Sequence, residues 1–274
     1  MGLQTGRLKI QKLLFLTVAI FFIFSCAGLS TQSDTADPFE QGLALFKQGK
    51  YEKALPFFER SVESRTDFAK GYLYLGRSFL NLSKWHKAIP PIRTAISLST
   101  GKMKQEAANV LLDALMGAAL LEFEKGDLDS AAGHLKEILD IKPEFIKARD
   151  ELVKTLFAFA DKLMSEGLID EAILRYKEIL ALAPALLRAQ EDLIRALSEF
   201  AERLLQEGRF EDAIEPYSEL IELAPEEPGA YIGLAKALLK NGDIVKALQT
   251  IKNALQKDPA SSEALSLFRE ILMQ

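Results

Sequence analysis

Cysteine and histidine are the side chains of this sequence best suited to covalent or metal chemistry, and both are scarce. The chain of 274 residues has one cysteine, Cys26, and two histidines, His86 and His134. A single cysteine excludes an intramolecular disulfide, and neither histidine has a partner at the spacing of a zinc motif. We therefore expect no metal and no cofactor, which leaves Cys26 as the candidate for covalent modification.

Carboxylates are abundant, but their arrangement does not predict a catalytic site. The sequence has no glycine-rich phosphate loop and no G-x-S-x-G nucleophile elbow. The acidic residues of a stretch such as 188–203, RAQEDLIRALSEFAER, are spread around the surface of a predicted helix. The sequence therefore predicts a protein that is not an enzyme and has no small-molecule substrate.

The N-terminus has the organisation of a secretory signal. Residues 1–12 carry three basic side chains and no acidic one, and residues 13–24 form the apolar run LLFLTVAIFFIF. This run is short for a membrane span, which needs about 20 apolar residues. We predict that residues 1–25 are a signal peptide.

The rest of the chain is mildly acidic. When the first 26 residues are left out, 31 basic and 39 acidic residues remain. A surplus of acidic residues argues against binding to the phosphate backbone of nucleic acids. We therefore expect no nucleic-acid partner.

Cys26 ends a segment that resembles the bacterial lipobox. In IFSC, residues 23–26, an aliphatic and a small residue precede the cysteine, although Phe24 is a less common residue at its position. The resemblance implies a lipoprotein whose Cys26 receives diacylglycerol and becomes the first residue of the mature chain. Because Ala27 follows, it implies the outer membrane and a periplasm-facing body; the inner membrane is the alternative. An uncleaved anchor and an ordinary signal peptide are the other interpretations.

A polar stretch separates Cys26 from the rest of the chain. Residues 27–38, AGLSTQSDTADP, are mostly small or polar. Such a linker is flexible, with a reach of about 20 Å for a dozen residues. We predict that residues 26–38 are a lipidated cysteine with a flexible tether.

Six later segments share one pattern, in which an alanine lies five residues after a turn position. The turn position is glycine in five segments and Ser83 in the second. The shared alanines are Ala54, Ala88, Ala131, Ala172, Ala213 and Ala247. Apolar residues at helical spacing follow each alanine, and a proline closes four segments. The pattern resembles the tetratricopeptide repeat, a helix–turn–helix unit of about 34 residues.

The resemblance covers residues 39–260 and implies an all-α fold, a right-handed α-solenoid of six repeats. One helix pair cannot bury its apolar face alone, so neighbouring pairs must stack. Residues 261–274 have Leu265, Phe268 and Leu272 at helical spacing, and we predict a capping helix there.

The spacing of the shared alanines predicts helix lengths. It runs 34, 43, 41, 41 and 34 residues, so the middle repeats are longer than the standard unit. The added residues precede the turns at Gly167 and Gly208 in stretches without other glycines or prolines. Seven residues are about two helical turns. We therefore predict lengthened first helices in repeats three, four and five; a loop of that size is the alternative.

Proteins with such repeats often hold an extended peptide or a partner helix on the surface lined by the first helices. Carried over by register, the resemblance assigns these residues to a partner-binding groove: Phe39, Leu43, Phe46, Lys70, Leu73, Tyr74, Arg77, Leu80, Met116, Leu120, Phe123, Phe157, Asp161 and Met164. The fifth repeat adds Ser198, Glu202 and Leu205. The N-terminal half of this set is apolar and aromatic, and the C-terminal half is more acidic. Packing between neighbouring helices is the alternative role for each residue.

These features together predict a membrane-anchored scaffold of the bacterial cell envelope. It would bind protein partners in its groove and reach the membrane through lipidated Cys26. Pilus, secretin and outer-membrane assembly are the processes that the resemblance suggests. The alternative is a regulator that activates an envelope enzyme such as a cell-wall synthase or hydrolase.

Overall fold

The structure is a computed structural model that describes residues 37–274, which form thirteen α-helices. The predicted signal peptide and Cys26 lie outside the described residues. The predicted all-α class is confirmed. Within residues 37–274, no helix combines the length and the apolar character that a membrane span requires.

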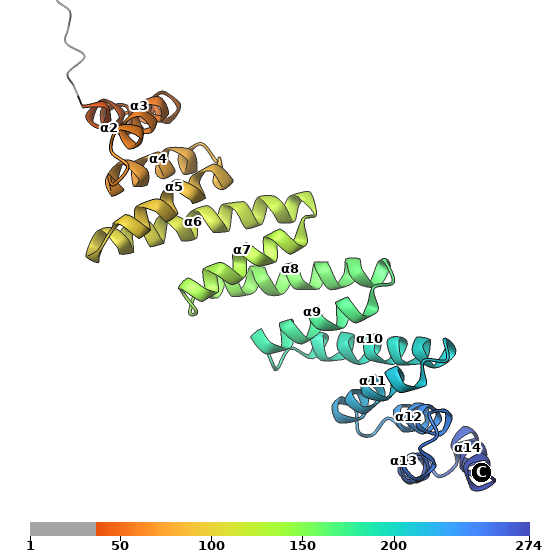
Figure 1. The fold of residues 1–274 in the computed structure, drawn as a ribbon. Coiled ribbons are helices and arrows are strands. Elements are labelled where there is room, and N and C mark those ends of the chain that lie inside the picture. Colours follow the sequence, from red (N-terminus) through yellow and green to blue (C-terminus); the bar gives the residue numbers. More distant parts are fainter. Residues whose placement is uncertain (1–36) are drawn as a thin grey trace, which may run out of the picture. The chain divides into compact units, whose positions relative to one another are not determined.

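The chain divides into two compact units, and the division between residues 110 and 111 falls inside α6, Gly101–Lys125. In the first unit, the complete helices form two hairpins (Figure 1). They are α2 (Pro38–Lys47) with α3 (Tyr51–Ser64), and α4 (Ala69–Asn81) with α5 (Trp85–Leu98). Helix α3 also contacts α4, so the two hairpins stack.

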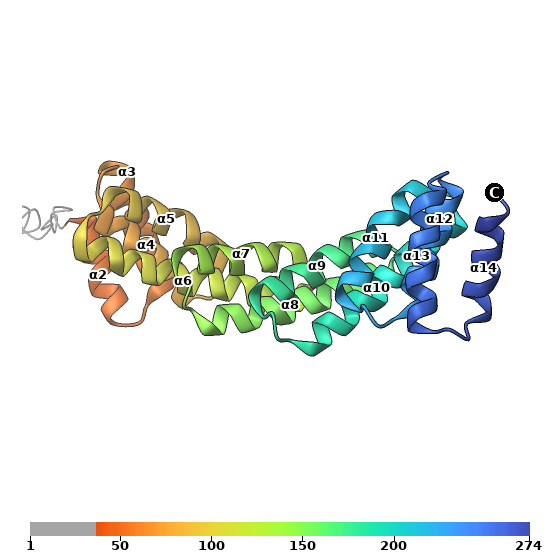
Figure 2. The same cartoon turned by 90° about the horizontal axis from the view of Figure 1, so that it is seen from below.

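The second unit, described by itself, also consists of stacked helix hairpins. Its helices are α7 (Leu128–Ile141), α8 (Ile146–Ser165), α9 (Ile169–Leu182), α10 (Leu187–Gln206), α11 (Phe210–Leu223), α12 (Pro228–Lys240), α13 (Ile244–Lys257) and α14 (Ser262–Leu272). Helices α8 and α9, α10 and α11, and α12 and α13 form hairpins, and each hairpin contacts the next. Helix α14 lies beside α13 and also contacts α12 (Figure 2).

Each hairpin turns at a residue with a positive φ angle. The predicted turn glycines have φ between 72° and 88°, and they are Gly49, Gly126, Gly167, Gly208 and Gly242. Ser83 occupies the equivalent position of the second hairpin with φ 54°, and no other non-glycine residue in the described part of the chain has a positive φ. This region favours glycine because a β-carbon crowds the backbone there. The prediction of the turns is confirmed.

The shared alanines of the second helices are completely buried. The exposed fraction of all six side chains is 0 %, at Ala54, Ala88, Ala131, Ala172, Ala213 and Ala247. In a close-packed interior, a larger side chain at such a position forces its neighbours apart. The repeated alanine therefore permits the close approach of helices within each unit.

The middle first helices are longer than the others, as predicted. Helix α6 has 25 residues, and α8 and α10 have 20 each, whereas α4 and α12 have 13 each. The difference of seven residues between 20 and 13 is about two helical turns. The added residues extend the helices and do not form loops, because they include no residue that would end a helix.

Helix α14 has the predicted position but buries a different stripe of side chains. Its buried residues are Ala264, Leu267 and Ile271, whereas Leu272 is 61 % exposed. The predicted stripe of Leu265, Phe268 and Leu272 is therefore displaced by one residue. A stripe chosen from large side chains overlooks Ala264, whose small size allows the closest helix approach.

Candidate protein-binding groove

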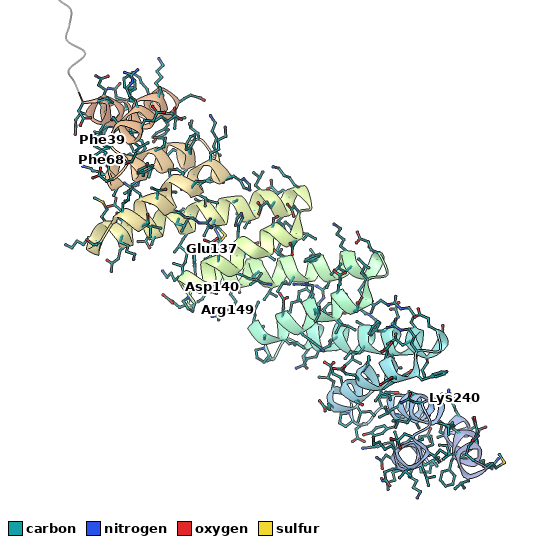
Figure 3. The ribbon with its side chains drawn as sticks, in the orientation of Figure 1. Phe39, Phe68, Glu137, Asp140, Arg149 and Lys240 are labelled. Carbon is teal, nitrogen blue, oxygen red and sulfur yellow. The ribbon has the colours of Figure 1, made fainter. Side chains whose placement is uncertain are left out.

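Aromatic rings of the first unit form one cluster. The ring centroid of Phe39 lies 4.9 Å from that of Phe68, and the two side chains lie together in Figure 3. The Tyr74 ring lies 5.7 Å from Phe39, 5.2 Å from Phe46 and 5.8 Å from Phe58. Edge contacts of this type stabilise aromatic pairs. The cluster fills the interior of the first unit and is not an open groove.

Four predicted groove residues are core residues. Phe39 is 2 % exposed, Leu43 9 %, Leu73 1 % and Met116 8 %. Their assignment to an open groove is therefore wrong. On a helix, residues only one or two positions apart lie on different faces, so a small error in register assigns a residue to the wrong face. The repeat register does not distinguish the stripe that faces the groove from the one that contacts the next helix.

The other predicted residues of the first unit belong to the aromatic cluster or lie beside it. Phe46, Tyr74 and Leu80 are half-buried. The Lys70 ammonium lies 5.4 Å from the centroid of the Phe39 ring. The Arg77 guanidinium lies over Tyr74 and forms an ion pair of 2.7 Å with Glu106. Both cations thus cover aromatic faces of their own chain.

Apart from Met116, the predicted residues on α6 and α8 of the second unit are half-buried or exposed. They are Leu120, Phe123, Phe157, Asp161 and Met164. The guanidinium of Arg188 lies 4.3 Å from the Phe157 ring centroid, and its Nη2 atom lies 3.7 Å from Asp161 Oδ2. The Lys154 ammonium lies 4.8 Å from the Phe123 ring centroid. Cations from the same chain therefore occupy these aromatic faces as well.

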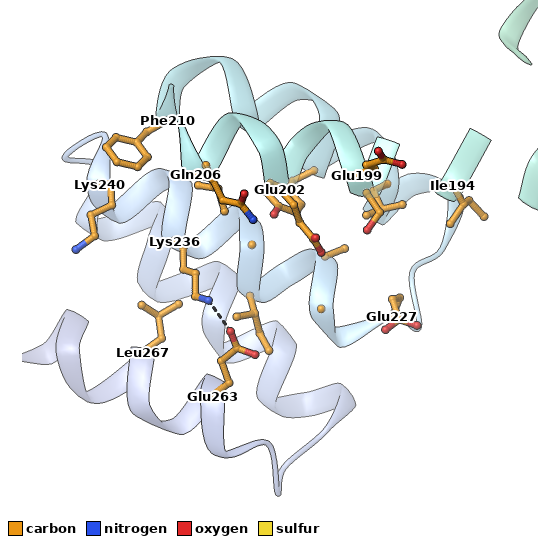
Figure 4. A pocket seen from close by; sticks show the side chains of 18 of the residues that line it. Ile194, Glu199, Glu202, Gln206, Phe210, Glu227, Lys236, Lys240, Glu263 and Leu267 are labelled. Carbon is orange, nitrogen blue, oxygen red and sulfur yellow. Dashed lines mark hydrogen bonds and ion pairs between the residues drawn. The ribbon is translucent and has the colours of Figure 1, made fainter. Parts of the chain in front are cut away.

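An open groove in the second unit is lined by residues of α10, α11, α12 and α14, and Figure 4 shows many of the side chains that line it. Its volume is about 1040 Å³. The residues predicted for the fifth repeat, Ser198, Glu202 and Leu205, all line it. We call it the α10–α14 groove; its other lining residues include Ile194, Glu199, Gln206, Phe210, Tyr217, Lys236, Lys240, Glu263 and Leu267.

Acidic side chains predominate in the α10–α14 groove. It is lined by six glutamates, Glu191, Glu199, Glu202, Glu227, Glu263 and Glu270, and by three bases, Arg195, Lys236 and Lys240. Lys236 Nζ lies 2.5 Å from Glu263 Oε1, and Lys240 Nζ lies 3.2 Å from Glu270 Oε1. Arg195 pairs with Asp192, which is not a lining residue. Every lining base is therefore already paired with a carboxylate.

The four remaining glutamates of the groove have no ion-pair partner among residues 37–274. They are Glu191, Glu199, Glu202 and Glu227. Carboxylates in a cleft, without counter-charges, produce a negative potential that attracts cations. The groove is therefore chemically suited to a positively charged ligand.

Two segments of the chain match known family models. Residues 39–102 match one model and residues 204–274 match another, and both models are described as tetratricopeptide repeat. These two segments are therefore similar to tetratricopeptide repeats. The second match runs from the last turn of α10 through α14 and thus includes most of the groove.

Solved tetratricopeptide repeat (TPR) structures are similar to this chain at low identity. The TPR domain of P58(IPK) is 20 % identical, with 86 % of this chain and 77 % of that chain covered and a TM-score of 0.29. TTC0263 of Thermus thermophilus is 19 % identical, with coverages of 86 % and 98 % and a TM-score of 0.29. YrrB, a TPR protein with an unusual peptide-binding site, is 16 % identical, with coverages of 77 % and 97 % and a TM-score of 0.29. A search of curated proteins finds no match.

The TPR register also explains which groove residues the sequence prediction missed. Adding the 34-residue repeat spacing to Ser198, Glu202 and Leu205 gives Ile232, Lys236 and Leu239, and all three line the groove. The prediction ended with the fifth repeat and did not include α12. The contribution of α14 follows only from the folded structure, because that helix lies outside the six repeats.

Tyr217 of α11 is one of the lining residues of the groove. Its side chain is only 4 % exposed. Burial and the charges of Glu202 and Glu263 raise the pKa of Tyr217 to about 12, so the phenol is protonated at neutral pH. Its hydroxyl makes no hydrogen bond with any residue that the structure describes. The hydroxyl is therefore a polar group that remains available to a ligand.

Proposed function

We propose that this chain is a lipid-anchored scaffold of the bacterial envelope that holds a partner protein in the α10–α14 groove. The groove carries the proposal. It is open, has a volume of about 1040 Å³ and is lined by consecutive TPR first helices. Half-buried apolar side chains, among them Ile194, Leu205 and Phe210, lie beside charged ones along it. Mixed surfaces of this kind suit an extended segment or an amphipathic helix of another protein.

The N-terminal sequence supports anchoring in a membrane. A basic segment, an apolar run and Cys26 follow one another in the order of a lipoprotein signal. The polar tether of residues 26–38 would separate the repeats from the membrane by about 20 Å. In this arrangement, the repeats face the periplasm from the outer membrane, and the partners belong to pilus, secretin or outer-membrane assembly.

Metabolic labelling tests the anchor. Cells that express the wild-type chain or Cys26→Ser are grown with a labelled fatty acid, and the protein is isolated. We expect label on the wild type and none on the variant. An unlabelled wild-type chain would refute lipid anchoring at Cys26.

Site-specific crosslinking in native membranes tests the groove. A photo-crosslinking amino acid replaces Gln206, an exposed lining residue, or Gln256, an exposed residue of α13 that does not line the groove. We expect Gln206 to crosslink to a structural envelope protein and Gln256 not to do so. Equal crosslinking from both positions would argue against partner binding in the groove. Capture of one synthase or hydrolase, with altered turnover, would indicate the regulatory alternative.

A further inference from the structure

We infer that the α10–α14 groove selects a basic partner segment, and that the Tyr217 hydroxyl, Glu202 and Glu263 together receive a lysine or arginine side chain of that segment. This inference rests on the proposed function, because it specifies the chemistry of the partner in the same groove. Three observations support it: the four glutamates without an ion-pair partner, Glu202 among them, the unpartnered phenol and the way Glu263 already holds an ammonium group.

The carboxylates come from opposite walls of the groove. Glu202 belongs to α10 and Glu263 to α14, and Figure 4 shows both side chains directed into the space between these helices. Glu202 has no ion-pair partner among the described residues. Complementary charge across an interface accelerates encounter and rejects partners of the wrong sign. An acidic segment would therefore be repelled from this groove.

The phenol of Tyr217 is a separate indication of a ligand. The side chain is 4 % exposed, lines the groove and makes no hydrogen bond with residues 37–274. No described residue satisfies this hydroxyl, so a ligand that supplies a donor can form a new hydrogen bond with it. The phenol oxygen would accept a hydrogen bond from an ammonium or guanidinium group. Glu202, Tyr217 and Glu263 line the same groove, so a cation bound there lies among all three groups.

Lys236 shows how the groove holds an ammonium group. Its Nζ atom lies 2.5 Å from Glu263 Oε1, in a pair that is 41 % and 60 % exposed. An exposed pair of this kind is weak and exchanges readily with solvent. A partner cation could share Glu263 with Lys236 and use the uncompensated charge of Glu202. Apolar side chains beside it, such as Ile194 and Phe210, favour a segment with apolar residues next to the basic ones.

Short labelled peptides test this selectivity with the full-length chain in nonionic detergent. They share one leucine- and alanine-based framework and differ only in carrying lysine, arginine, glutamine or glutamate at the same positions. Binding is measured by fluorescence anisotropy at low and high salt. We expect the lysine and arginine peptides to bind at least about tenfold more tightly than the glutamine peptide, and the glutamate peptide not to bind. Added salt should weaken binding of the basic peptides.

Two variants test the named residues. Glu202→Gln and Tyr217→Phe should each weaken binding of the lysine peptide by about three- to tenfold. Glu222→Gln, at an exposed residue of α11 outside the groove, is the carboxylate control. Tyr231→Phe removes a hydroxyl that donates to the Pro225 carbonyl outside the groove and is the phenol control. Both controls should bind like the wild type.

The outcomes separate this inference from the proposed function. Equal binding of the glutamine and lysine peptides would overturn the inference and leave partner binding in the groove intact. Wild-type affinity in both Glu202→Gln and Tyr217→Phe would likewise overturn it. If none of the peptides binds, the inference fails, and crosslinking from Gln206 still decides the proposed function. Should Tyr217→Phe lose helicity, Glu202→Gln and the salt dependence of the wild type decide the result.

Discussion

The ring of Tyr217 occupies the space in which Gly233 would otherwise carry a side chain. A β-carbon added at Gly233 would lie 2.2 Å from Cε1 and 2.3 Å from Cζ of that ring. Real β-carbons do not approach other atoms so closely, and the obstructing atoms belong to a rigid ring. The absence of a side chain at Gly233 of α12 therefore allows Tyr217 of α11 to reach the α10–α14 groove.

Replacing Gly233 tests this relationship. Gly233→Ala should lower the free energy of unfolding by about 1–3 kcal/mol, because the ring must move in a close-packed site. It should also weaken peptide binding by displacing the phenol. Thermal unfolding followed by circular dichroism measures the first effect. Gly133→Ala is the control. Gly133 is an exposed residue of α7, and nothing lies within 4 Å of an added β-carbon there. The free energy of unfolding should therefore rise by about 0.5–1 kcal/mol. A neutral Gly233→Ala would show that the ring is not fixed.

The turn at Ser83 is a site for stabilisation. Its φ of 54° is the conformation that glycine adopts at the other five turns. Ser83→Gly should therefore raise the free energy of unfolding by up to about 1 kcal/mol, since glycine removes the steric penalty. The converse control is Gly167→Ser, at φ 76° with open space around it, which should destabilise by a similar amount. In urea unfolding, we expect the two variants to change the free energy of unfolding in opposite directions. A change in the same direction for both would contradict the prediction.

Alkaline pH should destabilise the fold through Tyr217. The folded-state pKa is raised from 10.0 to about 12 by burial and by Glu202 and Glu263. A raised pKa means that the folded protein holds the proton more tightly than the unfolded chain. The raised pKa of Tyr217 therefore adds at most about 3 kcal/mol to the free energy of unfolding. This stabilisation is complete below pH 10 and is lost between pH 10 and about 12. The free energy of unfolding is measured at several pH values in the wild type and in Tyr217→Phe. The comparison is needed because Tyr176 also has a raised pKa and affects the alkaline profile of both proteins. A wild type and variant with the same alkaline profile would contradict the assignment.

Removing Lys236 should strengthen the binding of basic peptides. Lys236→Met frees Glu263 and makes the groove more negative, so the lysine peptide should bind several-fold more tightly. The cost in stability should stay below about 1 kcal/mol, because the ion pair is exposed. Lys177→Met removes a comparable pair with Glu219 outside the groove and should leave peptide binding unchanged. Weaker binding by Lys236→Met would show that Lys236 itself contacts the partner.

The aromatic cluster of the first unit should behave as a core. Phe39→Ala should lower the free energy of unfolding by about 3–5 kcal/mol, because the side chain is 2 % exposed and contacts three other rings. Lys70→Ala, at an exposed residue over the same ring, should change it by less than about 1 kcal/mol. Circular dichroism during denaturation measures both. A stable Phe39→Ala would return Phe39 to the set of surface candidates.

Features that depend on neighbouring residues could be predicted from the sequence. The glycine turns, the proline after each later hairpin and the seven added residues of α8 and α10 all follow from backbone geometry within one helix pair. The lipobox at Cys26 is also local, and it stays a prediction. These features were sufficient for the fold class and for the position of the groove residues on α10.

Only the tertiary structure decided which side chains remain open to a partner. Leu43 and Glu202 share one position of the repeat register, six residues before the turn glycine, yet Leu43 is a core residue and Glu202 is exposed. The difference arises because exposure depends on how closely helices from distant parts of the sequence approach one another. The unpartnered hydroxyl of Tyr217 has the same origin: α11 supplies the ring, Gly233 of α12 makes room for it, and α14 brings Glu263 to the groove.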